Sequence, residues 1–491
     1  MDRRNFLAGT TGAAALLAGC STGFATDDDE DGDDANPNGS AEESNDGGNP
    51  TLPDGPEASP TVVDFKTASL TATVADDHVS TADRLRVSLD FVEPATPDGP
   101  ARLAAAVYNG KSFEQTFRLR RTLVFDDPAR ARNDDRDSIY LVPTEATPPA
   151  ETVPDLTRDE KGRWRVASLR DEWYPKTWTL GPDEELTAEL ALAAHPDEGN
   201  SPIVPGRYEF ARRGNAVAIA VWPTDEPGPD GDSGFADADP PTLPNEDGEM
   251  AWYHQAGPGT ETYLEPSAEA IEAPGTIEFA FVNRSREAAS GNPGYWRLYK
   301  LVDDEWYPVA PWEWVQPLEH VGPGSVRERR LHCYHGDPIE TTEARTVGHL
   351  GGGRYAFAVG YAVADETHAA MFDLEAPELS VGAEEDATVA DEGDRIVVEL
   401  PNYEGARRPA TFTATRTDEA GERLLPEQLP RRPQRAFRNS LALFEPGVER
   451  VEVKTDRGTA LRPFGYEENE TRPVEYRGEA FEVTGVLEPD D

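Results

Sequence analysis

Short segments in which apolar and polar residues alternate recur along most of this chain. Clear examples lie at 85–91, 277–281, 355–361 and 396–400. A period of two places every second side chain on one face of a β-strand, and clusters of Pro, Gly and Asp bound these segments as they bound strands. After the first twenty residues we find no long amphipathic helix pattern. Many short strands with turn-rich connections predict an all-β protein built from antiparallel sandwiches.

Two stretches of the chain repeat the same order of landmarks. Residues 102–109 align with 276–283, and each segment ends on an asparagine. An aromatic-Arg-Leu segment, a tryptophan, a Gly-Pro turn and a closing Gly-Arg-Tyr follow in both stretches. The paired landmarks are Phe117-Arg118-Leu119 and Trp296-Arg297-Leu298, Trp164 and Trp306, Gly181-Pro182 and Gly322-Pro323, and Gly206-Arg207-Tyr208 and Gly353-Arg354-Tyr355. The first stretch is longer because of an insertion at 125–160, whose Pro, Asp and Arg content is typical of loops.

This order resembles that of bacterial immunoglobulin-like domains found on many cell-surface lipoproteins. That family has a strand ending in Asn, an aromatic-x-Leu strand, a Trp hairpin, a turn with Pro and Gly, and a closing Gly-x-Tyr strand. The resemblance covers 85–222 and 262–363 and implies tandem immunoglobulin-like β-sandwiches. The order is more distantly similar to the intracellular proteinase inhibitor family, a related sandwich. Residues 375–491 are expected to form a third sandwich, on the basis of alternation and length.

The first twenty residues have the composition of an export signal. Arg3 and Arg4 precede an apolar run of about a dozen residues, well short of the ~20 that a membrane-spanning helix needs. The segment resembles a twin-arginine signal, which exports folded proteins. Leu17-Ala18-Gly19-Cys20 resembles a lipobox, which implies a lipid on the Cys20 sulfur and an anchored protein on the extracellular face of the cell membrane. The alternative is an ordinary secretory signal with an incidental cysteine.

Acidic residues outnumber basic ones by 94 to 46, so the formal net charge is -48. Such a surface repels a phosphate backbone, which excludes nucleic acid as a partner. It also repels itself in dilute buffer, whereas in roughly molar salt the Debye length falls to about 3 Å and the repulsion is screened. An acidic, lysine-poor exported chain resembles haloarchaeal proteins, and a merely acidic mesophilic protein is the alternative. We expect the protein to unfold on transfer to low salt.

Composition also divides the chain into parts. One segment combines a run of Asp and Glu with Gly, Asn, Ser and Pro and has almost nothing apolar to bury, which is typical of a disordered tether. A second segment, rich in Pro, Gly and Asp, predicts a linker. The expected organisation is a signal peptide with lipobox at 1–20, an acidic tether at 21–60, sandwiches at 61–222, 250–374 and 375–491, and a linker at 223–249.

Histidines gather in the second sandwich, together with one of the two cysteines. Among them are His254, His320, His332, His335 and His349, and Cys333 lies in the same range. If 331–335 is a strand, Cys333 and His335 share one face, so a tetrahedral metal site would need further ligands from other strands. Nothing in the spacing requires this, and we expect no metal, no other cofactor, and a Cys333 that is a small buried hydrophobe. If Cys20 is lipidated, Cys333 has no second cysteine to pair with, so we expect no intramolecular disulfide.

Aromatic residues are dense near the middle of the second sandwich. If exposed, Trp306, Trp312 and Trp314 would form a platform that binds a sugar or another protein. Trp312 and Trp314 would share one strand face, and that face is equally compatible with the core.

Three Asn-x-Ser/Thr triplets, which accept N-glycans in exported proteins, begin at Asn38, Asn283 and Asn469. We expect Asn283, at a strand end, to be the more accessible of the two that fall in folded units.

No pattern in the sequence points to catalysis. We find no nucleophile elbow, no HExxH and no locally supported Ser/His/Asp arrangement. We therefore expect a non-enzymatic protein with a binding or spacing role in the cell envelope of a halophile. Its partners would be the membrane, through the lipid, and an envelope protein or glycan. The alternatives are a sugar- or metal-binding module centred on 250–374 and a surface proteinase inhibitor.

Overall fold

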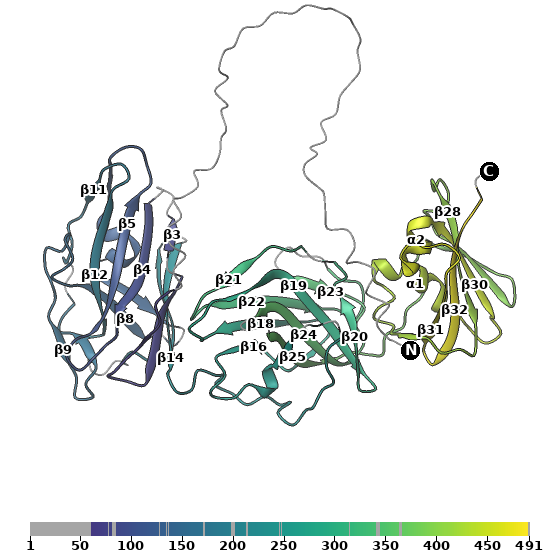
Figure 1. Cartoon of the computed structure of the whole chain (residues 1–491), viewed down its shortest axis with the longest axis horizontal. Coiled ribbons are helices and arrows are strands. Elements are labelled where there is room, and N and C mark those ends of the chain that lie inside the picture. The colour runs from purple at the N-terminus through teal and green to yellow at the C-terminus, as the bar shows by residue number, and fades with distance from the viewer. Residues whose placement is uncertain are drawn as a thin grey trace, which may run out of the picture.

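The computed structural model describes residues 60–489, except 77, 81–84, 127, 134, 136, 170–171, 198–201, 213–214, 245, 247, 314, 340–343 and 363–365. Strands predominate and gather around three main hydrophobic cores that follow one another along the chain. Figure 1 shows three units in a row, coloured from purple through green to yellow. We name them unit 1 (60–223), unit 2 (249–375) and unit 3 (376–489). The all-β class predicted from the alternation is confirmed.

Unit 1 is one sheet that curls around its own core. Its path runs β1-β2-β14-β13-β7-β8-β12-β5-β4-β3, with antiparallel neighbours throughout, while β9 and β10 extend it beside β12 and β6 pairs with β11. The bounds are β1 (Val63–Asp64), β2 (Leu70–Asp76), β3 (His78–Ser80), β4 (Leu85–Glu93), β5 (Ala101–Asn109), β6 (Gln115–Phe117), η1 (Leu119–Arg121), η2 (Leu123–Phe125), β7 (Ala129–Arg132), β8 (Ser138–Pro143), β9 (Leu156–Arg158), β10 (Trp164–Val166), β11 (Trp178–Leu180), β12 (Glu185–Ala194), β13 (Gly206–Arg212) and β14 (Asn215–Pro223).

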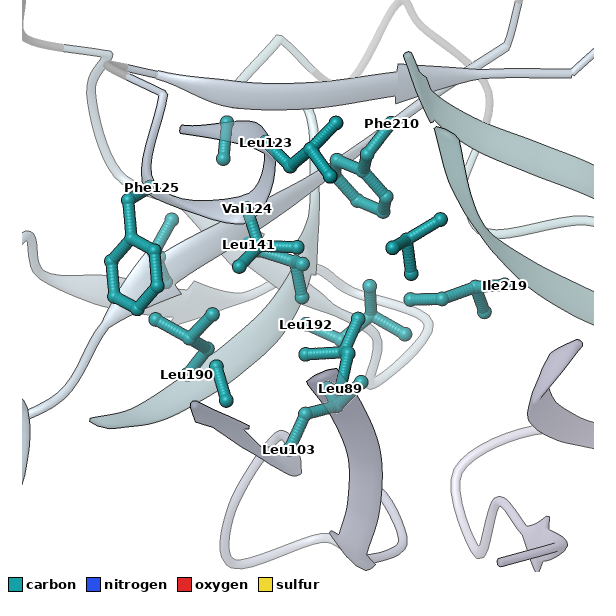
Figure 2. Close-up of a cluster of buried hydrophobic side chains, with 14 of the residues drawn as sticks. Leu89, Leu103, Leu123, Val124, Phe125, Leu141, Leu190, Leu192, Phe210 and Ile219 are labelled. Carbon is teal, nitrogen blue, oxygen red and sulfur yellow. The ribbon is translucent and has the colours of Figure 1, made fainter. Parts of the chain in front are cut away.

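Alternation explains which side chains of unit 1 are buried. Along β4, every second residue from Leu85 to Phe91 is buried, as the pattern predicted. Figure 2 shows Leu89 of β4 near Leu103 of β5 and Leu192 of β12, so three strands contribute to one cluster. Each fully buried side chain of this size stabilises the fold by roughly 1.5–3 kcal/mol relative to an exposed one.

Unit 2 is a sandwich of two sheets. One has the order β15-β25-β24-β19-β20, with β17 beside β25 and β21 beside β19, and the other has the order β16-β18-β22-β23. The bounds are β15 (Glu249–Trp252), η3 (Tyr253–Gln255), β16 (Thr262–Pro266), β17 (Ala270–Glu272), β18 (Gly275–Asn283), β19 (Ala289–Val302), β20 (Glu305–Ala310), β21 (Glu319–Val321), β22 (Val326–Cys333), β23 (Arg345–Val347), β24 (Gly353–Ala362) and β25 (Glu366–Glu375). Phe279 of β18 stacks on Phe357 of β24 with ring centroids 4.2 Å apart, which joins the two sheets.

The internal repeat is visible in matching hydrogen bonds. Asn109 ends β5 and Asn283 ends β18, and both side chains are fully buried. The amide of Asn109 donates to the carbonyls of Leu180 (3.2 Å) and Gly181 (2.8 Å), and that of Asn283 donates to the carbonyl of Val321 (2.8 Å). In each unit the asparagine therefore ties the end of its strand to the Gly-Pro turn.

The closing Gly-Arg-Tyr segments also match. Gly206 and Gly353 have φ angles of 145° and 138°, which L side chains rarely adopt. Two residues later, the hydroxyl of Tyr208 donates to the carbonyl of Val204 (2.9 Å), and that of Tyr355 to the carbonyl of Gly351 (2.6 Å). A tyrosine that bonds back to the backbone in this way is the tyrosine corner of immunoglobulin-like sandwiches.

The segment at 223–249, which composition predicted to be a linker, packs against unit 2 as a strap. Leu243 lies in a cluster with Trp252 and Trp306 on the outer face of the seven-stranded sheet, and the indole nitrogen of Trp306 donates to the carbonyl of Pro241 (2.9 Å). The hydroxyl of Tyr299 also donates to the carboxylate of Glu246 (2.5 Å). A chain rich in Pro and Gly can follow a surface without strands, which is why composition alone did not reveal the packing.

Unit 3 is one seven-stranded sheet with two short helices against it, where alternation alone had led us to expect a two-sheet sandwich. The order is β26-β27-β30-β28-β32-β31-β29, and the β27–β30 and β29–β31 pairs are parallel. The bounds are β26 (Thr388–Asp391), β27 (Arg395–Glu399), β28 (Pro409–Arg416), β29 (Glu422–Leu424), η4 (Arg432–Gln434), α1 (Arg435–Leu441), β30 (Arg450–Asp456), α2 (Arg457–Leu461), η5 (Arg462–Phe464), β31 (Thr471–Tyr476) and β32 (Glu479–Leu487). Phe437 of α1 packs edge-on against Phe412 of β28, so helices cover the face that a second sheet would cover.

None of the helices in the described part of the chain is both long enough and apolar enough to cross a bilayer.

Candidate functional site

Several residues singled out from the sequence lie outside the described residues. They are Arg3, Arg4 and Cys20 of the export signal, Asn38 of the first glycan triplet, and Trp314.

The tryptophan platform is wrong for one of its three residues, Trp306. Trp306 is 3% exposed, stacks on Trp252 with ring centroids 6.1 Å apart, and belongs to the cluster beneath the strap. Trp312 lies in a bend after β20 and is only partly exposed. A side chain whose faces are covered by the protein's own residues cannot stack on a sugar, so Trp306 is a structural landmark, as its counterpart Trp164 is in unit 1.

Asn283 is not an accessible glycan acceptor. Its side chain is 0% exposed, and its amide donates to Glu287 and Val321 while its oxygen accepts from Ser285. The strand end was correctly placed, but the turn folds over it. Asn469, by contrast, is exposed in the loop before β31 and stays a predicted acceptor.

Three histidines of unit 2 bond to separate partners. His332 bonds to Thr276 (2.6 Å), His320 to Ser290 (2.8 Å) and His335 to the carbonyl of Leu350 (3.0 Å). Within the described residues, no group of three or more His, Cys, Asp or Glu side chains is placed to hold a metal ion. Cys333 is fully buried, and burial raises the pKa of its thiol to about 12, so it packs as a small apolar side chain.

A cleft lined by several ionised side chains lies between unit 2 and unit 3. This cleft of about 820 Å³ is lined by Lys300 of β19 and by Arg423, Glu427 and Arg477 of unit 3. The ammonium of Lys300 and the carboxylate of Glu427 are 2.5 Å apart, and their side chains are 12% and 3% exposed. Arg423 adds a second link across the cleft, an ion pair to Asp303 at 2.7 Å. The cleft therefore lies along an interface between unit 2 and unit 3 that two ion pairs bridge.

Glu427 is the hub of this interface, which we name junction 2–3. Its Oε1 also accepts from the backbone N–H of Gly351 (3.2 Å), and its own carbonyl accepts from Arg431 (3.1 Å). Arg431 in turn donates to the carbonyl of Gly348 (2.7 Å). Burial lowers the pKa of Arg431 to about 10, which leaves the guanidinium charged at neutral pH. Unit 3 is thus bonded to the turn that carries the tyrosine corner of unit 2.

A second interface, junction 1–2, joins the outer face of unit 1 to the Gly-Pro turn of unit 2. The hydroxyl of Ser325 donates to the carbonyl of Ala75 in β2 (2.9 Å), in a buried position. A Cβ at Gly324 would lie 2.5 Å from Thr73 and 2.7 Å from Ala220. Only glycine therefore lets the turn seat against the β2–β14 surface. At the rim, Arg286 pairs with Asp64 at 2.6 Å.

These junctions were not found by sequence reasoning. Glu427 is one acidic residue among 94, and no local pattern distinguishes it from solvated carboxylates. The Gly-Pro turn of unit 2 was identified as a landmark, but the repeat gave no reason to expect it at an interface. Both junctions connect one unit to the next, so they bear on how rigidly the units are joined and do not point to a reaction.

Comparisons with known proteins add little to this geometry. No protein-family profile and no curated protein matches the chain. Among solved structures, one match is to the native conformation of E. coli alpha-2-macroglobulin, with 14% sequence identity and a TM-score of 0.13. The match covers 71% of this chain and 18% of the macroglobulin chain, so it spans about a fifth of the length of the macroglobulin. A likeness at this level carries no argument about function.

Proposed function

We propose that the protein is a non-catalytic spacer on the outer face of the cell membrane, anchored by a lipid on Cys20. In this proposal the acidic segment 21–60 is a tether, and units 1, 2 and 3 stand beyond it as one semi-rigid body. The observation that carries the proposal is the pair of bonded junctions. A flexible array of domains would not need a buried Lys300–Glu427 pair between two units. Nor would it need a glycine at position 324, where a side chain would collide with unit 1.

The competing functions have less support. A sugar platform loses one of its three proposed tryptophans because Trp306 is buried. A metal-binding role gains no cluster of ligands from the described histidines.

Fractionation of cells tests the anchoring half of the proposal. Wild-type protein is expected in the membrane fraction and open to protease added to intact cells. Cys20→Ser should be exported and then released into the medium, since it lacks the sulfur that carries the lipid. Replacing Arg3 and Arg4 by lysine should retain the uncleaved chain inside the cell. Wild-type protein found in the cytosol with its first nineteen residues intact would refute the proposal.

The acidic surface supports a salt-rich setting for this spacer. Its net charge of -48 gives a self-repulsion that only high ionic strength screens. Thermal unfolding followed by circular dichroism should give a midpoint that falls steeply between molar and dilute KCl. A midpoint that does not depend on salt would remove the halophilic part of the proposal and leave the spacer.

A further inference from the structure

A pocket of about 320 Å³ in unit 3 is lined mainly by arginines. Its ionised residues are Arg431, Arg432, Arg435 and Arg438, with Glu384 as the only carboxylate among them. Acidic residues outnumber basic ones by 94 to 46 in the whole chain, so four arginines against one glutamate reverses the general composition. The pocket therefore concentrates positive charge on an otherwise negative molecule.

The local fold gathers these side chains. Arg432 begins the 3₁₀ turn η4, and Arg435 and Arg438 follow on α1, so the three are spaced at i, i+3 and i+6. Side chains three positions apart are neighbours on a helix, so Arg435 lies beside both Arg432 and Arg438, and like charges placed so repel. An arrangement of this kind is unfavourable by itself, and a bound anion would relieve it.

Two of the four guanidinium groups already have protein partners. Arg435 forms a two-pronged pair with Glu384, in which Nε donates to Oε1 (2.8 Å) and a terminal nitrogen donates to Oε2 (2.6 Å). Arg431 donates to the carbonyls of Glu427 and Gly348 at junction 2–3. These two side chains define the walls of the pocket and are held in place.

The other two guanidinium groups have donors to spare. Arg438 donates from Nε to the carbonyl of Gly382 (3.1 Å), which orients its terminal nitrogens without using them. Arg432 is exposed and has no hydrogen bond or ion pair to the rest of the described chain. Neither residue has a carboxylate within ion-pair distance in the described residues. Each therefore presents an open fork of N–H donors, the geometry that binds oxyanions.

We propose that this pocket binds a tetrahedral oxyanion, a phosphate or sulfate group, between the forks of Arg432 and Arg438. Two forks on separate helical turns suit a group with four oxygens in three dimensions better than a planar carboxylate. The volume is several times the ~30 Å³ that one water occupies in the liquid, so an ester of the anion also fits. The inference is independent of the spacer role, although it would give the spacer a surface that can hold an anionic partner.

Isothermal titration calorimetry with inorganic phosphate tests the assignment, on the full-length protein in molar KCl. Wild type should bind one phosphate per chain in a saturable manner. Arg432→Gln combined with Arg438→Gln should weaken binding about tenfold or more, because it removes both open forks. Arg407→Gln combined with Arg408→Gln is the matched control, since it removes the same charge from exposed positions of the same unit and should leave binding unchanged.

Two further arms separate charge from geometry and free ion from ester. Replacing Arg432 and Arg438 by lysine keeps the charge and should still weaken binding, and wild-type affinity in that variant would overturn the fork-based assignment. Glycerol 3-phosphate binding beside inorganic phosphate would assign the site to esterified groups, whereas binding of inorganic phosphate alone would assign it to the free ion. No saturable binding of either, or equal binding by the glutamine variant, would overturn the proposal.

Discussion

The asparagine that ends β18 offers the sharpest test of how the repeated sandwich is built. Replacing Asn283 by alanine deletes its two amide hydrogen bonds, both 2.8 Å long, and the two that its oxygen accepts from Ser285. The carbonyl of Glu287 keeps the hydroxyl of Ser285 as a donor (3.0 Å), so the carbonyl of Val321 and the N–H of Ser285 lose most. Each buried polar group left unpaired costs about 1–3 kcal/mol, so the expected loss is about 2–6 kcal/mol.

Hydrogen exchange measured by mass spectrometry can localise this loss within a chain of three units. Peptides from β18 and β22 should exchange faster in the variant by the corresponding factor, while peptides from β28 and β30 of unit 3 should not change. Asn109→Ala should do the same in unit 1, because Asn109 has the same role there.

Asn292→Ala is the matched control. Asn292 also makes two side-chain hydrogen bonds, to Val315 and Gly294, but at a partly exposed site where water can replace them, so its cost should stay below about 1 kcal/mol. If Asn283→Ala is no more destabilising than Asn292→Ala, the strand-end asparagine does not hold the turn, and the structural account of the repeat is refuted.

Three other predictions concern buried ionisable groups. Lys300→Met should leave Glu427 buried without its cation and destabilise junction 2–3 by about 3 kcal/mol, read as faster exchange of 424–431, and Lys300→Met with Glu427→Gln should recover much of the loss. Burial lowers the pKa of His368 from 6.5 to about 4, so the fold favours the neutral ring. About 3 kcal/mol of stability should therefore be lost as the pH falls from about 6.5 through about 4. Acid titrations of the wild type should be steeper in that window than those of His368→Gln, and equal slopes would contradict this. Burial raises the pKa of Cys333 to about 12, so iodoacetamide should modify it only after unfolding, and rapid modification of the native protein would contradict its buried position.

The sequence predicted several strands where one face of a sheet meets a core, but it assigned 125–160 to a loop, and that range includes β7 and β8 inside the sheet of unit 1. Ile277, Phe279 and Phe281 alternate in the sequence and are all fully buried on β18. The landmark repeat also predicted structure, because Gly206 and Gly353 both take a φ that favours glycine and each precedes a tyrosine corner. Such features depend on nearest neighbours and on backbone sterics, which a sequence contains.

The errors arose where burial comes from segments distant in the chain. Trp306 lies on the outer face of its sheet, and it is buried because the strap at 223–249 crosses it. Asn283 is covered by a turn some forty positions downstream. Unit 3 alternates like a sandwich strand set, but α1, a seven-residue segment with little periodicity, covers its sheet. No period along a strand tells which remote segment will cover its second face.

The distance between labels on adjacent units tests most directly the claim that the units form one semi-rigid body. Nitroxides can be placed on cysteines at Asp98, Glu328 and Glu419, which are exposed positions in units 1, 2 and 3, while buried Cys333 stays unlabelled and Cys20→Ser removes the lipid site. Pulsed electron–electron double resonance in molar salt should give one narrow distance distribution across each junction. Gly324→Val should broaden only the pair that spans junction 1–2, and Gly336→Val, at an open position, should broaden neither. Broad distributions in the wild-type protein across both junctions would contradict the account.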